Sequence, residues 1–96
     1  MEVLDPATVD AELAGGIAWE RQGDELVKTR RGKDFADSLA YANVVGALAE
    51  EMNHHPDIDI RWRTLTFTLA THSAGGVTDL DLQLAARIDQ ALTQQG

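Results

Sequence analysis

The stretch from Asn53 to His72, NHHPDIDIRWRTLTFTLATH, decides how the rest of the chain is arranged and contains all three histidines of the 96 residues. Pro56 cannot continue a helix and disfavours helical backbone at the residue before it, so a preceding helix is expected to end at about Asn53 or His54. A strand then returns the chain to His72. Histidine changes charge nearest neutral pH, so this cluster suggests proton transfer or metal binding.

The middle of the stretch alternates between two kinds of side chain, as a strand with one buried face does. One face carries Leu65, Phe67 and Leu69 and is expected to pack on helices. The other face carries Trp62 and a row of threonines, and it is either solvated or part of a subunit contact. The pattern predicts one long strand, with residues 56–62 as an alternative separate strand.

Capping residues and apolar residues that repeat every three or four positions predict three helices. Asp5-Pro6 begins the first, which ends at Gly15-Gly16. Asp34 caps the second, which spans residues 35–52, and Thr78 caps the third. The stripes expected to be buried are Phe35, Leu39, Ala42, Val45, Leu48 and Met52 in the second helix and Leu80, Leu84, Ile88 and Leu92 in the third.

A hairpin is predicted before the long helix. Residues 17–21 alternate with apolar members at odd positions, Gln22-Gly23-Asp24 has the composition of a turn, and residues 25–31 return as a basic edge strand. This order of elements is typical of an α+β fold in which helices cover one face of an antiparallel sheet. We expect residues 1–96 to form a single domain.

Composition limits the classes of partner. Sixteen acidic residues against eight basic ones give a formal net charge of −8, which disfavours nucleic acid and anionic membranes, because both need a basic surface. No apolar run approaches the ~20 residues of a membrane span and no secretory signal is evident, so we expect a cytoplasmic protein. The absence of cysteine excludes disulfides and thiol chemistry.

The histidines allow several kinds of chemistry. His54 and His55 are adjacent and point to opposite sides of an extended segment, which disfavours one shared metal ion. Two histidines on either side of a pocket can instead act as acid and base, for example in a dehydration, with Glu50 and Asp81 near enough in sequence to orient them. Structural use of the histidines stays open, and capping of the last helix alone also explains Asp81. Phosphate binding at Gly75-Gly76 is a further alternative, which no lysine or glycine-rich motif supports.

The run Glu50-Glu51-Met52-Asn53-His54-His55-Pro56, followed by Trp62, Thr71-His72, Gly76, Thr78 and Asp81, resembles the pterin-4a-carbinolamine dehydratase (4a-hydroxytetrahydrobiopterin dehydratase) family. The resemblance extends from Trp19 to about Leu92. It implies a four-stranded antiparallel sheet with three helices packed on one face. It also implies dehydration of 4a-hydroxytetrahydropterin, the 4a-carbinolamine, to quinonoid dihydropterin. That step recycles the cofactor of aromatic amino-acid hydroxylases and needs no metal or organic cofactor.

The resemblance also assigns roles to residues. His54 and His72 would be the acid/base pair that acts on the 4a-hydroxyl and on the N5 proton. The substrate-binding positions would be His55, Glu50, Asp81 and Trp19. The partners expected are a small pterin and further copies of the chain, as a dimer or tetramer.

Two other functions compete with the dehydratase. Some relatives of the family also act as dimerisation partners of transcription factors, so the face with Trp62 and the threonines could be a protein-binding surface. A role in pterin-cofactor synthesis would use the same pocket on a related pterin.

Overall fold

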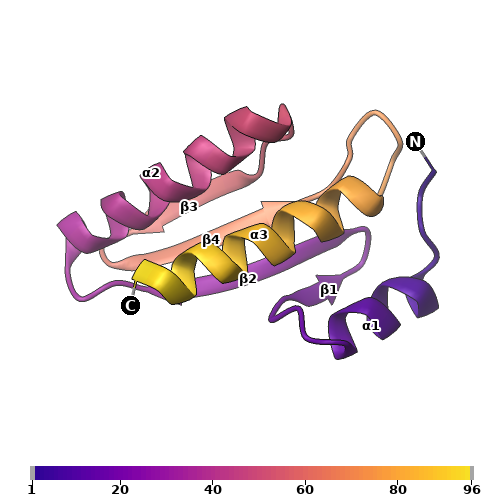
Figure 1. Ribbon diagram of the computed structural model, residues 1–96, viewed down its shortest axis with the longest axis horizontal. Helices are drawn as coiled ribbons and strands as arrows, with labels where there is room; N and C mark the ends of the chain where they lie inside the picture. Colours follow the sequence, from indigo (N-terminus) through magenta and orange to yellow (C-terminus); the bar gives the residue numbers. More distant parts are fainter. Residues whose placement is uncertain (1, 96) are drawn as a thin grey trace.

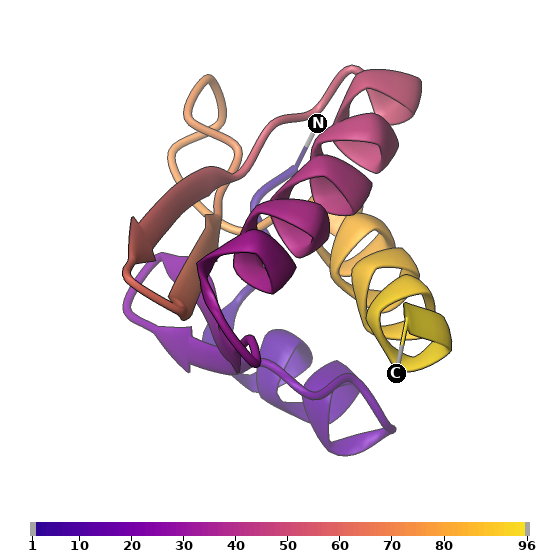
Figure 2. The same ribbon diagram turned by 90° about the vertical axis from the view of Figure 1, so that its left-hand side faces the viewer.

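A computed structural model describes residues 2–95 of the chain, without the side chain of Gln95. Its elements are the helices α1 (Pro6–Ala14), α2 (Phe35–Met52) and α3 (Asp79–Gln95), and the strands β1 (Glu20–Gln22), β2 (Glu25–Arg31), β3 (Asp57–Arg61) and β4 (Thr64–Leu69). The strands form one antiparallel sheet in the order β1-β2-β4-β3. The helices lie on one face of this sheet (Figures 1 and 2), which confirms the predicted α+β fold.

The helix boundaries follow from capping. The carboxylates of Asp5 and Asp34 accept hydrogen bonds from the backbone N–H groups of Thr8 and Asp37, each at 2.8 Å, at the starts of α1 and α2. The hydrogen bond from Thr8 holds the pKa of Asp5 below its usual value. Helix α2 ends at Asn53, whose φ of 49° lies in the left-handed region that asparagine tolerates.

The core lies between the sheet and the helices. Leu26 of β2 lies opposite Leu69 of β4, and Phe67 stands two residues before Leu69, so the alternation of the strands buries these three side chains on the helix-covered face. The α3 stripe of Leu84, Ile88 and Leu92 covers this face and is fully or almost fully buried.

The buried face of α2 agrees only in part with the predicted stripe. Val45 is buried, and Ala42, Leu48 and Met52 pack partly buried against the core, as predicted. Phe35 and Leu39 instead keep 48% and 41% of their surface exposed, and Ser38, Tyr41 and Ala49 are buried. The Ser38 hydroxyl donates to the backbone carbonyl of Arg63 at 2.8 Å, and a Cβ at Gly32 would lie 2.5 Å from that hydroxyl oxygen. This close approach turns Ser38 toward the sheet and rotates Phe35 and Leu39 outward.

Trp62 lies in a turn and not in a strand. Arg61 pairs with Thr64, so the strand predicted as continuous is a hairpin of β3 and β4, and the alternative of a separate strand in residues 56–62 is confirmed. Trp62 has a φ of 53° and is 68% exposed, and the Arg63 guanidinium lies 4.9 Å from the centre of its ring. The tight turn overrides the alternation that had placed Trp62 on the threonine face.

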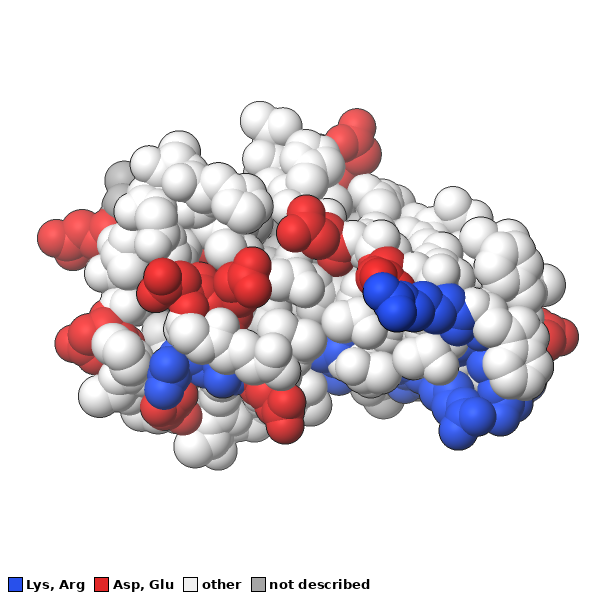
Figure 3. Space-filling view, turned by 180° about the vertical axis from the view of Figure 1, so that it is seen from behind, with Lys and Arg blue, Asp and Glu red and all other residues white. Residues whose placement is uncertain are grey.

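Charge is unevenly distributed over the face of the sheet that no helix covers. Figure 3 shows Lys and Arg gathered mainly at the end where β3 and β4 are joined, and Asp and Glu mainly toward the other end. The basic end includes Arg31 and Arg61, which both lie beside Thr64. Among residues 2–95, no helix is long and apolar enough to cross a membrane.

Candidate active site

The first histidine of the site is fixed by the end of α2. Because Asn53 turns the chain into the left-handed conformation, the backbone N–H of His54 reaches the carbonyl of Ala49 at 3.1 Å. The His54 ring is only 11% exposed, and its Nε2 lies 2.5 Å from Oδ1 of Asp81. With Nε2 engaged by the carboxylate, Nδ1 is the ring nitrogen left for another partner.

Asp81 takes part both in the capping of α3 and in the contact with His54. Its Oδ2 accepts hydrogen bonds from the backbone N–H of Thr78 at 2.9 Å and from the Thr71 hydroxyl at 2.8 Å, and the Thr71 and Thr78 hydroxyl oxygens lie 2.7 Å apart. The Asp81 half of the predicted cap of α3 is therefore present, whereas the Thr78 hydroxyl contacts Thr71 and not the backbone N–H of Asp81. The other carboxylate oxygen of Asp81 holds His54. Asp81 is 0% exposed, so it acts on a ligand through the residues that it holds, His54 and Thr71, which both line a cavity.

His55 has a different environment from its neighbour in the chain. Its Nε2 lies 2.5 Å from Oε2 of Glu50, and the two side chains are 53% and 77% exposed. The adjacent carboxylate of Glu51 pairs with Arg87 at 3.1 Å. Two acidic residues near the C-terminal end of a helix oppose its dipole, and both here have partners that explain their position.

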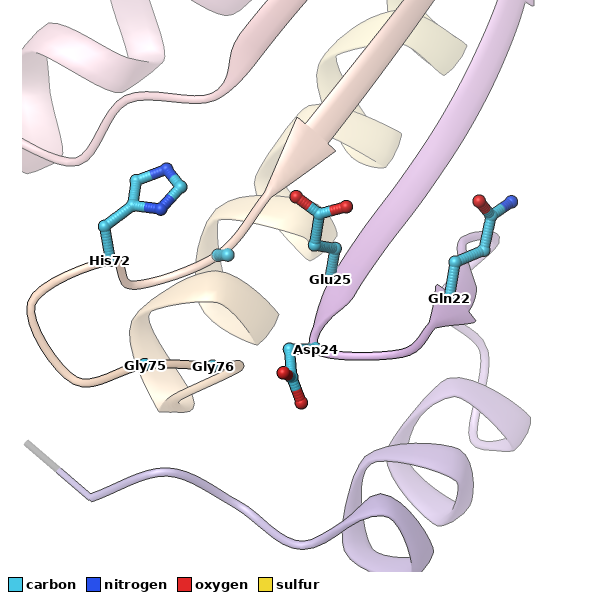
Figure 4. Close-up of a pocket in the computed structure, with 7 residues that line it drawn as sticks. Gln22, Asp24, Glu25, His72, Gly75 and Gly76 are labelled. Carbon is cyan, nitrogen blue, oxygen red and sulfur yellow. The ribbon is translucent and has the colours of Figure 1, made fainter.

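His72 is presented by a closed loop after β4. Thr71 forms an isolated bridge with Gly76, and the backbone N–H of Gly75 donates to the Thr71 carbonyl at 2.9 Å. Gly75 has a φ of 87°, a conformation that glycine adopts without strain. The His72 side chain is exposed, and among the described residues none hydrogen-bonds to its ring (Figure 4).

Two neighbouring cavities share His72 and Ala70. One, of about 250 Å³, is lined by Asn53, His54, His55, Ala70, Thr71, His72 and Ser73. The other, of about 400 Å³, is lined by Gln22, Asp24, Glu25, Ala70, His72, Gly75 and Gly76. Together they have the size of a small-molecule site. The structure thus brings all three histidines to the wall of one cavity, and His72 also lines a second, acidic cavity beside it.

Trp19 lies elsewhere. It is 5% exposed, packs against Phe67 with ring centres 6.5 Å apart, and donates from its indole N–H to Asp89 at 2.8 Å. Asp89 also pairs with Lys28 at 2.9 Å, so this group ties the segment before β1 to α3. Trp19 lines neither cavity that contains His72, and its position is that of a core residue.

The sequence indicated no role at the site for several residues that the structure places there. Thr71 and Thr78, noted in the sequence only in the motif and as a helix cap, complete the polar network around Asp81, and Glu25 and Ala70 line the cavity beside His72. Glu25 and Ala70 could have been located from the pairing of the strands. Leu26 pairs with Leu69, which lies only three residues before His72. Among the described residues, no group of three or more His, Cys, Asp or Glu side chains is placed so that it could hold a metal ion.

The fold and the site define a small α+β protein with histidines around a ligand-sized cavity. The chain belongs to the pterin 4 alpha carbinolamine dehydratase family, whose model matches residues 2–91. A relative from Nocardia farcinica, provisionally named pterin-4-alpha-carbinolamine dehydratase, is 53% identical over 89 residues, which are 93% of this chain and 94% of the relative. A relative of the same name from Mycolicibacterium smegmatis is 45% identical over 97% of this chain and 99% of its own.

Two solved structures share the fold. The transcriptional coactivator/pterin dehydratase from Brucella melitensis superposes with a TM-score of 0.84 at 26% identity, over 92% of this chain and 96% of the other. A pterin dehydratase-like protein described as a RuBisCO assembly factor in the alpha-carboxysome gives a TM-score of 0.64 at 28% identity, over 76% of this chain and 87% of the other. The fold therefore occurs both in a protein described as a pterin dehydratase and in a protein described as an assembly factor.

Proposed function

We propose that this protein dehydrates 4a-hydroxytetrahydropterin to quinonoid dihydropterin and that His54 and His72 transfer the protons. The observation that carries the proposal is the cavity whose wall contains both histidines, in a chain of the carbinolamine dehydratase family. One histidine arrives from the end of α2 and the other from the loop after β4, so a ring bound over Ala70 lies between them.

The reaction needs two proton transfers and no change in oxidation state. The C4a–O bond breaks as the hydroxyl takes a proton and leaves as water. The N5–H bond breaks as that proton passes to a base, and the electron pair forms the C4a=N5 double bond. Two histidines on opposite sides of the substrate can supply one proton and accept the other.

The two histidines are suited to these steps in different ways. Asp81 holds Nε2 of His54, which fixes the ring and leaves Nδ1 for the substrate. His72 has no hydrogen-bond partner for its ring among the described residues, and its exposed position lets water reach the ring between turnovers. His55 lines the cavity and contributes to binding of the pterin, and Glu50 contributes by holding the His55 ring. Trp19 supports the site only through the core.

The test is the decay of a 4a-hydroxytetrahydropterin generated in situ by an aromatic amino-acid hydroxylase. We expect the purified protein to accelerate the decay, and we expect His54→Ala and His72→Ala each to lose about 10²–10⁴ of the rate while staying folded. Gln83→Ala, an exposed change on α3, is the control and should match wild type. Wild-type rates in both histidine variants would overturn the acid/base assignment.

The physiological role proposed for this reaction is recycling of the pterin cofactor of a hydroxylase, without a metal or an organic cofactor, in the cytoplasm. A role in pterin-cofactor synthesis would use the same residues on a different pterin. Product analysis with a series of reduced pterins separates the two roles, since recycling predicts preference for the 4a-hydroxy substrate.

Protein binding is the second candidate function, because both structural neighbours have descriptions that include coactivation or assembly. The surface proposed for it is the open face with Thr64, Thr66 and Thr68, beside the exposed Trp62. Self-association into a dimer or tetramer belongs to the same proposal. Mass measurement of the native protein tests self-association, and copurification of a stoichiometric partner without any effect on pterin decay would favour the binding function over the dehydratase.

A further inference from the structure

The cavity beside His72 contains a carboxylate that the proton transfers do not use. Glu25, the first residue of β2, is half-buried and lines this cavity together with His72 and Gln22. Figure 4 shows its carboxylate in the space between His72 and Gln22, whereas the carboxylate of the neighbouring Asp24 points the other way. The two adjacent acidic residues of this turn are therefore not equivalent.

The register of the sheet fixes Glu25 relative to the histidines. Leu26 pairs with Leu69, so the next step of the ladder sets Glu25 opposite Ala70, two residues before His72. Side chains alternate along a strand, which brings Glu25 and Ala70 to the face opposite the core. Ala70 follows Thr64, Thr66 and Thr68 on that face and is the smallest of the four, so it leaves room for a flat ring between Glu25 and the histidines.

Glu25 also lacks a partner. Among the described residues no side chain or backbone group donates a hydrogen bond to its carboxylate, while the carboxylates of Asp81, Glu50 and Asp89 each hold a histidine or lysine. A carboxylate accepts hydrogen bonds only, and a half-buried one is best satisfied by a ligand with donors. The cavity thus presents an acceptor pair beside a proton-transfer residue.

We propose that Glu25 positions the pterin by accepting hydrogen bonds from its 2-amino group and its N3–H. This inference rests on the proposed function. The two donors lie side by side on the pyrimidine ring and match a carboxylate in the same forked way as a guanidinium does. Because C2 and C4a are opposite corners of that ring, a carboxylate at the amino edge directs C4a away from Glu25, across Ala70 and toward His72 and His54.

Glu25→Gln tests this role because it keeps the shape but replaces one acceptor oxygen with a donor that opposes N3–H. We expect KM for the 4a-hydroxytetrahydropterin and Kd for 7,8-dihydrobiopterin to rise by about 10- to 100-fold, with kcat within about 3-fold of wild type. Asp24→Asn removes the same charge from the adjacent position and is the matched control, with both constants unchanged. Equal effects in the two variants would show that only the negative charge of the turn matters and would overturn the proposal.

A 2-desamino dihydropterin supplies the second arm of the test. Wild type should bind this analogue about as weakly as Glu25→Gln binds the parent compound, and Glu25→Gln should no longer distinguish the two ligands. If Glu25→Gln discriminates as strongly as wild type, the contact is not with the amino edge and the inference is wrong. Glu25→Asp retracts the carboxylate, so its Kd for 7,8-dihydrobiopterin should lie between those of wild type and Glu25→Gln. If Glu25→Gln unfolds, Glu25→Asp replaces it in the comparison of the two ligands.

The same data separate failure of this inference from failure of the proposed function. An active wild type with an unaffected Glu25→Gln variant overturns the role of Glu25 alone. A wild type that binds dihydropterin through Glu25 but does not accelerate carbinolamine decay overturns the dehydratase and leaves the binding contact in place.

Discussion

His54 and His55 are neighbours in the chain, and each has its Nε2 2.5 Å from a carboxylate oxygen, yet the two pairs differ in their access to water. The side chains of His54 and Asp81 are 11% and 0% exposed, and those of His55 and Glu50 are 53% and 77% exposed. The partner of His54 comes from α3, twenty-seven residues away, whereas Glu50 lies one turn back on the helix that ends before His55.

This difference shows what burial adds to the same chemical pair. An exposed ion pair contributes roughly 0–1 kcal/mol, because water and salt screen it and two long side chains must be ordered. The Asp81 carboxylate is instead held by Thr71 and the N–H of Thr78, so it cannot rotate away from His54 without breaking the cap of α3. The buried pair is a fixed part of the scaffold, and the exposed pair can open to admit a ligand.

The largest effect is expected from breaking the buried pair. Asp81→Asn keeps the size of the side chain but presents an amide where His54 needs an acceptor, which favours the wrong tautomer of the ring. We expect kcat to fall by about 10²–10³-fold with KM nearly unchanged. Loss of part of the capping network should also lower the free energy of unfolding by about 1–3 kcal/mol in urea titrations.

Glu50→Gln is the matched change in the exposed pair and should leave kcat and stability close to wild type. A kcat for Asp81→Asn equal to that of Glu50→Gln, in folded protein, would show that orientation of His54 by Asp81 has no role in turnover.

A smaller effect is expected from breaking the exposed pair. His55→Ala and Glu50→Gln should each raise KM by about 3- to 10-fold, because His55 lines the cavity, Glu50 holds its ring, and loss of either removes an exposed contact worth about 1 kcal/mol. The free energy of unfolding should change by no more than about 0.5 kcal/mol. Steady-state kinetics with the double variant test the pairing: if the two residues act together, the double change should cost little more than either single change.

The difference between the pairs was only partly predictable from sequence. The position of Pro56 and the adjacency of His54 and His55 predicted that the two rings point apart, and the capping pattern at Thr78 located Asp81 at the start of α3. A cap, however, uses one carboxylate oxygen. The contact of the other with His54 depends on how α2 and α3 pack, which no local pattern encodes.

The sequence predicted which helices and strands form better than it predicted which of their side chains are buried. Periodicity and capping located the three helices and gave the α+β class, because long amphipathic segments carry a strong signal. The first strand was less well located, since it was predicted in residues 17–21 and is Glu20–Gln22. Periodicity failed at Trp62, where a two-residue turn overrides alternation, and at Phe35 and Leu39, where the contact of Ser38 with Gly32 and Arg63 sets the rotation of α2. Trp19 was expected at the site on resemblance alone, and the structure places its ring in the core through Asp89 and Phe67.

The smallest effect is expected from a change in ionic strength, which distinguishes the exposed His55–Glu50 pair from the buried His54–Asp81 pair. Raising the ionic strength from about 0.1 M to about 1 M shortens the screening length from roughly 10 Å to 3 Å, which weakens interactions between exposed charges far more than between buried ones. The KM of wild type should therefore rise by about 2-fold toward that of Glu50→Gln, whose own KM changes less. The ratio of kcat between wild type and Asp81→Asn should stay constant, because Asp81 has no contact with solvent. Sucrose of matched viscosity controls for diffusion, and a salt-dependent kcat ratio would mean that water reaches the His54–Asp81 pair during turnover.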